Sequence, residues 1–201
     1  LDHFARHIGA SAGRGNYAEA AETGEIIDEC RRRLARLFNA PDPDRFLFGL
    51  NCSDGLNLAL KGMLEPGDHV VTTWMEHNSV LRPLRELEDR GLITVTRVRG
   101  DGAGFVHPAA LRAALTPTTR LIAVIHSSNV TGTLQPIREI GRMAREAEIP
   151  CLVDAAQSVG HLPIDFEEDF VDLIAFPGHK GLLGPLGTGV LYVRPGLEPS
   201  L

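Results

Sequence analysis

Residues 121–154 read LIAVIHSSNVTGTLQPIREIGRMAREAEIPCLVD. Short apolar runs predict strands over 121–126 and 151–154. Between them, residues 136–147 repeat apolar side chains at helical spacing, which predicts an amphipathic helix. A strand, a helix and a second strand in this order are typical of two parallel strands joined by a crossover helix.

The same alternation continues on both sides of this stretch. Further strands are predicted over 45–50, 69–74, 92–98, 172–176 and 189–193, and further helices over 17–38, 55–64, 79–90 and 108–115. Ser53 or Asp54 is the expected N-cap of the helix over 55–64. Apolar strands alternating with amphipathic helices predict a three-layer α/β/α fold, with a mainly parallel mixed sheet covered on both faces.

The composition excludes several classes of protein. With 201 residues, 43% hydrophobic content and a formal net charge of −6, the chain suits one sizeable globular domain and no nucleic-acid partner. The run 31–33 is a short arginine cluster preceded by acids, which indicates a solvated helix face. No apolar run approaches the roughly 18 residues of a membrane span.

Cysteine usage points to a reducing compartment. Cys30, Cys52 and Cys151 are too few and too scattered for a disulfide framework, and no Cys-x-x-Cys pair suggests a metal site. We therefore expect a cytoplasmic protein without a structural metal.

Lys180 is one of two lysines in the chain and lies in a glycine-rich run over 175–185. A lysine can lose its proton and form a Schiff base with an aldehyde, which arginine cannot do. Asp154 lies 180 − 154 = 26 residues upstream, at the end of a predicted strand. Pyridoxal phosphate (PLP) needs such a lysine and commonly an acid for its ring nitrogen. The plainer interpretations are a loop lysine and a helix-capping aspartate.

Other polar residues also follow predicted strands. His77 is either a loop histidine or an imidazole that stacks on a cofactor ring and moves protons. The stretch 51–55 joins a strand to a helix, where backbone amides and the helix dipole favour a phosphate. Ser53 and Asp54 are equally good as ordinary caps, and Cys52 is expected to be a small packed residue.

Asn129 and Gln157 also allow both a structural and a ligand-binding interpretation. Each is either a turn residue or a hydrogen-bond partner for a ring hydroxyl or a substrate carboxylate. Because ligands bind beyond the carboxyl ends of parallel strands, one edge of the sheet is expected to collect the polar residues that follow strands. These are Ser53, His77, Asn129, Asp154 and Lys180.

A family resemblance extends over about residues 11 to 193 and rests on six short motifs that occur in order along the chain. They are LNLALKG at 56–62, PGD at 66–68, MEHNS at 75–79, SNVTG at 128–132, VDAAQ at 153–157 and GHK at 178–180. With them the chain resembles the cysteine desulfurases of the class V aminotransferase superfamily, which are PLP enzymes of fold type I.

The resemblance implies a role for each matching residue. Lys180 would bind PLP covalently, His77 would stack on its ring and Asp154 would pair with the ring nitrogen. Asn129 and Gln157 would lie near the ring hydroxyl. The phosphate would be held by the helix start and by the histidine of the GHK motif, that is, by Cys52, Ser53, Asp54 and His179.

The chain departs from the family pattern in two respects. Family members usually carry Ser or Thr two residues before His179, whereas this chain has Pro177, which has neither a hydroxyl nor an N–H. The region that carries the nucleophilic cysteine and the carboxylate-binding arginine is also missing, and none of the three cysteines matches that nucleophile. We therefore expect an N-terminal helical segment over 1–40 and a PLP-binding large domain over 41–201, without the C-terminal small domain.

By resemblance, the full-length protein is expected to convert L-cysteine or a related amino acid to alanine. The sulfur would pass as a persulfide to an acceptor protein, and the enzyme would be a homodimer. Two alternatives stay open: a selenocysteine lyase or another class V enzyme, and an inactive fragment that only binds PLP.

Overall fold

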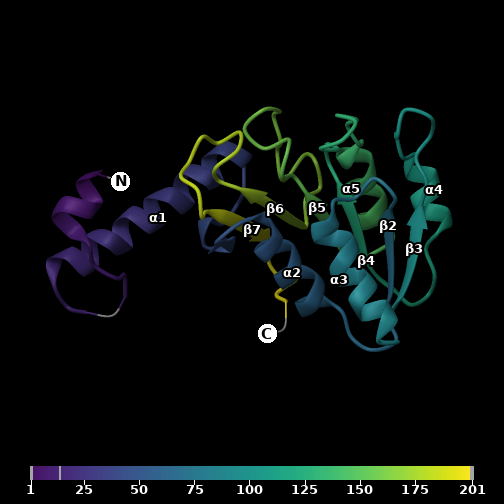
Figure 1. Ribbon diagram of the computed structural model, residues 1–201, viewed down its shortest axis with the longest axis horizontal. Coiled ribbons are helices and arrows are strands. Elements are labelled where there is room, and N and C mark those ends of the chain that lie inside the picture. Colours follow the sequence, from purple (N-terminus) through teal and green to yellow (C-terminus); the bar gives the residue numbers. More distant parts are fainter. Residues whose placement is uncertain (1, 14, 200–201) are drawn as a thin grey trace. The chain divides into compact units, whose positions relative to one another are not determined.

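A computed structural model describes residues 2–13 and 15–199. The chain divides into two compact units, Leu1–Asp44 and Arg45–Leu201 (Figure 1). Among the described residues, every helix is too short or too polar to cross a membrane.

The first unit consists mainly of one long helix. A single π-helical turn spans Phe4–Ile8, and α1 spans Ala18–Phe38, close to the predicted 17–38. Asn39 follows in the left-handed conformation (φ 52°), and its N–H is bonded to the carbonyl of Ala35, a common way for a helix to end.

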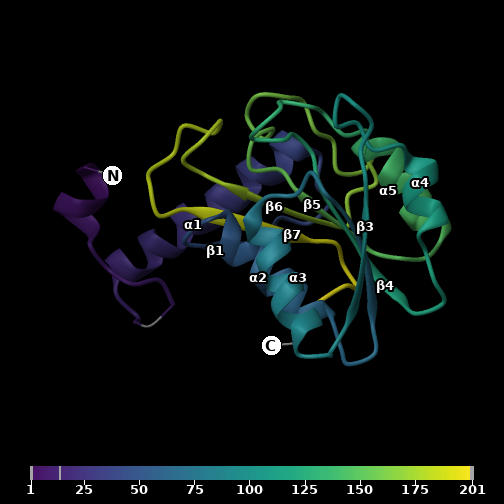
Figure 2. The same cartoon turned by 45° about the vertical axis from the view of Figure 1, so that its right-hand side comes forward.

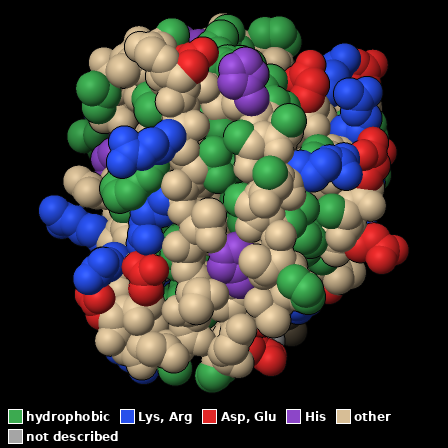
Figure 3. All heavy atoms as spheres, turned by 90° about the vertical axis from the view of Figure 1, so that its right-hand side faces the viewer, with side chains coloured by type: hydrophobic (Ala, Val, Ile, Leu, Met, Phe, Trp, Pro, Cys, Tyr) green, Lys and Arg blue, Asp and Glu red, His purple; other side chains and the backbone are tan. Residues whose placement is uncertain are grey.

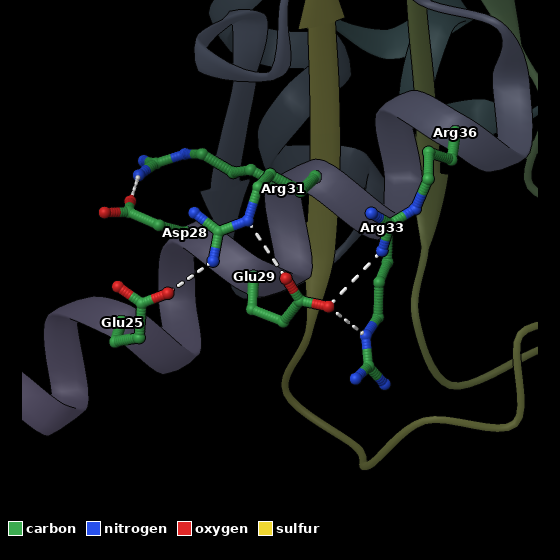
Figure 4. Close-up of polar contacts among 7 residues, drawn as sticks. Glu25, Asp28, Glu29, Arg31, Arg33 and Arg36 are labelled. Atoms are coloured by element: carbon green, nitrogen blue, oxygen red, sulfur yellow. Dashed lines mark hydrogen bonds and ion pairs between the residues drawn. The ribbon is translucent and has the colours of Figure 1, made fainter.

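Charged side chains pair along one face of α1. Glu29 accepts hydrogen bonds from Arg32 and Arg33, and an ion pair joins it to Arg36 (Figure 4). The Arg33 and Arg32 guanidinium groups lower the pKa of Glu29 to about 2. The arginine cluster thus forms ion pairs on a solvated helix face, as the sequence predicts.

The second unit contains a seven-stranded sheet with the order β1-β7-β6-β5-β4-β2-β3. The pairs β2–β3, β2–β4, β4–β5 and β5–β6 are parallel, and β7 is antiparallel to both β1 and β6. This arrangement confirms the mainly parallel mixed sheet. The strands span Phe46–Gly49 (β1), His69–Thr73 (β2), Thr94–Val98 (β3), Thr119–Ile125 (β4), Cys151–Asp154 (β5), Leu173–Pro177 (β6) and Gly189–Val193 (β7).

Helices cover both faces of the sheet (Figures 1 and 2). α2 (Cys52–Met63) and α3 (Asn78–Asp89) pack on one face, and their core includes Leu121 and Ala123 of β4. The alternate residues Ile122 and Val124 are equally buried but lie outside that core, because successive side chains of a strand point to opposite faces. α4 (Pro108–Ala113) and α5 (Ile137–Glu146) pack on that other side.

One predicted helix boundary is wrong. α2 begins at Cys52, not at residue 55, and its N-cap is Asn51, whose side chain accepts the Asp54 N–H at 3.0 Å. Asn51, Ser53 and Asp54 can all cap a helix, and the structure uses the first of them. Ser53 therefore lies in the first turn of α2, where backbone N–H groups have no partner within the helix.

The surface on the side of β3 and α4 carries mixed charge. Figure 3 shows acidic and basic side chains close together over this face, without a broad region of one sign.

Candidate functional site

A cavity lies at the carboxyl ends of the parallel strands, at the place where the sheet topology favours a ligand. Seven of the nine predicted site residues line it, and Asp54 and His179 do not. The lining comprises Cys52, Ser53, Leu56, His77, Ser79, Ile125, Asn129, Asp154, Ala156, Gln157 and Lys180.

Asp154 supplies the acidic side of the cavity. It is the last residue of β5 and only 2% exposed. Its Oδ1 accepts the Ala156 N–H at 3.0 Å and the Cys52 S–H at 3.6 Å. Burial raises the pKa of Asp154, while these hydrogen bonds and the nearby charges of His77 and Lys180 oppose that rise. A further cationic N–H donor in the cavity would stabilise the ionised carboxylate.

His77 is held by the start of α3. It is the N-cap residue, and its Nδ1 accepts the Ser79 N–H at 3.1 Å. A backbone N–H can only donate, so Nδ1 must present its lone pair. The proton of the neutral imidazole is therefore on Nε2, which is the nitrogen left to donate to a ligand.

The first turn of α2 supplies hydroxyl and amide donors. Ser53 Oγ lies 2.6 Å from Ser79 Oγ, and both residues line the cavity. Asp54 does not line the cavity, and its carboxylate accepts the Leu50 N–H at 3.0 Å. The structure thus brings Ser53 to the cavity and assigns Asp54 to the strand-to-helix turn.

Lys180 lies in the connection between β6 and β7. Two glycines let this connection lie against the segment after β5: a Cβ on Gly160, where φ is +83°, would lie 2.3 Å from the carbonyl carbon of Gly181. The neighbouring His179 has a buried Nδ1 with no partner within the described part of the chain. Pro177 ends β6 and is buried, and it is paired with Gly189 of β7.

Two polar residues at this edge were not among those predicted from the sequence. Ser79 lines the cavity, and the signal for it was its position two residues after His77 at a helix start. Glu76 is 6% exposed and accepts hydrogen bonds from Thr73 Oγ1 at 2.7 Å and from the Ile125 N–H at 2.9 Å. An acid three residues after a buried strand was the signal for Glu76.

The lining fits PLP by its chemistry. One amine, one buried carboxyl, one imidazole with a free N–H and a helix start with hydroxyl donors converge on a single cavity. His179, which precedes the lining residue Lys180 in the chain, has a buried Nδ1 without a hydrogen-bond partner among the described residues. By contrast, the described residues contain no cluster of three or more His, Cys, Asp or Glu side chains able to hold a metal ion.

The sequence is similar to those of proteins described as cysteine desulfurases. It is 39% identical over 206 residues to a probable cysteine desulfurase of Methanothermobacter thermautotrophicus, covering 100% of this chain and 51% of that protein. It is 42% identical over 174 residues to cysteine desulfurase IscS of Vibrio campbellii, covering 85% and 42% of the two chains. The chain thus spans about half the length of these relatives.

Solved structures share the fold. The apo cysteine desulfurase from Thermococcus onnurineus NA1 superimposes with a TM-score of 0.89 and 31% identity, covering 96% of this chain and 49% of that one. SspA in complex with cysteine superimposes with a TM-score of 0.91 and 33% identity, covering 96% of this chain and 56% of that one. The family model for class V aminotransferases matches residues 1–201. With this match over its whole length, the chain belongs to the class V aminotransferase family.

Proposed function

We propose that the full-length protein is a PLP-dependent cysteine desulfurase, and that this chain carries its cofactor-binding part. The observation that carries the proposal is the meeting of Lys180, Asp154 and His77 in one cavity. The similarity to cysteine desulfurases along the whole chain supports the choice of substrate.

PLP, when bound, supplies an electron-withdrawing ring that stabilises negative charge at the Cα of an amino acid. Lys180 would hold the cofactor through Nζ and release it to the substrate amine. Asp154 would accept the ring N–H, and this bond would keep its carboxylate ionised in spite of burial. His77 would lie over the ring, with Nε2 placed to exchange a proton with the substrate.

Asn129 and Gln157 are proposed to hydrogen-bond the ring hydroxyl. Ser53 and the backbone amides of the first turn of α2 would bind the phosphate, together with His179. Cys52 would contribute only through its backbone and its contact with Asp154, because its thiol already donates to that carboxylate.

The thiol that accepts the sulfur is proposed to lie outside this chain. Burial raises the pKa values of Cys52 and Cys151, which keeps both thiols protonated and unreactive at neutral pH. A thiolate elsewhere in the full-length protein would attack the substrate sulfur. The C–S bond would then break, the persulfide would form on the attacking cysteine, and alanine would leave after protonation.

The homodimer, the cytoplasmic location and the sulfur-acceptor protein belong to the same proposal and rest on the family alone. Sedimentation of the full-length protein would test the dimer. Mixing the persulfide-loaded enzyme with candidate acceptors would test the transfer.

The test of the cofactor site is absorbance spectroscopy of the protein mixed with PLP, before and after borohydride. Wild-type protein should show a lysine-linked band that borohydride fixes covalently, and Lys180→Ala should not. Release of alanine from L-cysteine by the full-length enzyme tests the reaction. Catalytic alanine release by Lys180→Ala would exclude the proposed role of Lys180, whereas turnover of selenocysteine alone would favour a selenocysteine lyase.

The isolated chain gives a second arm of the same test. If it retains PLP but turns over no amino acid, it is a binding fragment of the enzyme. Turnover by the isolated chain would contradict the proposal that the sulfur-accepting thiol lies outside it.

A further inference from the structure

Three polar groups form a continuous chain at the wall of the cavity. Ser53 Oγ lies 2.6 Å from Ser79 Oγ, and Ser79 Oγ lies 2.9 Å from His77 Nδ1. Ser53 belongs to the first turn of α2, and Ser79 to the first turn of α3. The chain thus links the groups proposed to hold the phosphate and the ring of the cofactor.

The hydroxyl hydrogens of the two serines can be placed in two ways along this chain of hydrogen bonds. In the first, Ser53 donates to Ser79, and the Ser79 hydroxyl donates to His77 Nδ1, where it competes with the Ser79 N–H for one lone pair. In the second, Ser79 donates to Ser53, and the Ser53 hydrogen is free to point into the cavity. Nδ1 then keeps only its bond from the Ser79 N–H.

An anion at the start of α2 selects the second arrangement. A phosphate oxygen accepts hydrogen bonds, so it favours the state in which Ser53 donates to it. The Ser53 carbonyl accepts a hydrogen bond from Asn57 Nδ2 at 2.9 Å, which holds the backbone of the serine in place. The carboxylate of the adjacent Asp54 already accepts the Leu50 N–H.

We propose that Ser79 is a positioning residue that couples phosphate binding at Ser53 to the hydrogen bonding of His77 Nδ1. When phosphate occupies the start of α2, Ser79 donates to Ser53 and withdraws its hydroxyl hydrogen from the imidazole. This inference rests on the proposed PLP site and adds a connection between its two ends. Phosphate binding thereby changes the hydrogen bonding of the imidazole that is proposed to stack on the cofactor ring.

The experiment compares PLP with pyridoxal, which lacks the phosphate, in wild-type protein, Ser79→Ala and Ser79→Thr. Loss of one hydrogen bond that orients a phosphate ligand should weaken PLP binding by about three- to tenfold in Ser79→Ala. Pyridoxal binding should change by less than about twofold, since no phosphate is present to be oriented. Ser79→Thr keeps the hydroxyl and should bind PLP like wild type.

A second readout needs neither catalysis nor the lysine linkage. Inorganic phosphate is titrated into the apo protein while the ring nitrogens of His77 are followed by ¹⁵N NMR. Wild type should show a phosphate-dependent shift of Nδ1, and Ser79→Ala should lose it. Ser53→Ala serves as the matched control, because it should lose phosphate binding while the Ser79–His77 contact remains.

Three results would overturn the coupling: equal losses for PLP and pyridoxal in Ser79→Ala, unchanged PLP binding in that variant, or the same Nδ1 response to phosphate in both proteins. Thermal unfolding of the apo variants checks that they fold. Failure of the proposed function gives a different result, because wild type would then form no Lys180-linked band while the phosphate titration would still test Ser79.

Discussion

The Sγ atom of Cys52 lies 3.6 Å from Oδ1 of Asp154, and both residues are buried at the wall of the same cavity. Burial and the adjacent Asp154 carboxylate raise the pKa of this thiol. Cys52 is therefore a hydrogen-bond donor in this cavity and not a nucleophile.

Alkylation of the folded protein should distinguish the three cysteines. We expect iodoacetamide to modify Cys30, which is exposed, well before Cys52 and Cys151, which are buried. Peptide mass spectrometry after short exposure measures the order. Cys52→Ala should still form the borohydride-fixed band with PLP, and rapid native alkylation of Cys52 would show that the thiol is not protected as described.

Glu76 should make stability depend on pH. Burial raises its pKa to about 8 from an ordinary value of 4.5, so the folded state holds the proton more tightly than the unfolded state. The stabilisation is complete below the unfolded pKa and is lost as pH rises through the folded pKa. The slope approaches about 1.4 kcal/mol per pH unit between these values, a loss of several kcal/mol in total.

Urea unfolding of wild type and Glu76→Gln at several pH values between about 5 and 9 measures this contribution. Glutamine keeps an accepting oxygen for Thr73 and Ile125 but cannot ionise. The free energy of unfolding of wild type minus that of the variant should fall as pH rises. A difference that stays constant across the range would contradict the assignment.

Gly160→Ala should disturb the segment that carries Lys180. Its Cβ would lie 2.3 Å from the Gly181 carbonyl carbon, so the backbone must move, and φ of +83° adds strain of more than about 1 kcal/mol. We expect weaker PLP binding and slower formation of the lysine-linked band. The matched control is Gly196→Ala, with φ +86° and nothing within 4 Å of the added Cβ, which should lose stability but bind PLP normally.

Asp172 offers a test of stability away from the cavity, at the amino ends of the strands. It is 2% exposed and accepts hydrogen bonds from Arg194 Nε at 2.7 Å, Arg145 Nη2 at 3.0 Å and the Cys151 N–H at 3.1 Å. Asp172→Asn should lower the free energy of unfolding by about 2–3 kcal/mol, less than for fully buried partners because both arginines are partly exposed. PLP affinity should stay unchanged, and a parallel loss of affinity would refute this separation.

Most of the strands were predictable because they are short apolar runs ended by a turn signal, and the strand ends lie within a few residues of the predicted ones. The start of α2 was less predictable, since three cap-forming residues follow one another. This segment packs closely against β7, since a Cβ added to Gly189 would lie 2.2 Å from the backbone of Asn51. Such contacts join residues far apart in the sequence and leave no local signal.

The candidate site likewise contains some residues that could be predicted from the sequence and others that could not. Lys180, Asp154 and His77 were predictable because each is a reactive side chain at the end of a strand or within a few residues of it. Ser79 acquires its place through Ser53, 26 residues away, and Glu76 through Ile125, 49 residues away. Neither relationship follows from composition or periodicity, because it depends on which strands become neighbours in the sheet.

The sheet order also constrains how the protein folds during synthesis. β1 is an edge strand whose partner is β7, and Phe46 pairs with Tyr192, 192 − 46 = 146 residues later. A ribosome must therefore complete nearly all of this chain before β1 gains its partner, and until then the hydrogen-bonding edge of an apolar strand stays open. Chaperone protection of the nascent chain would matter most in this interval, and slowing translation before β7 should increase aggregation.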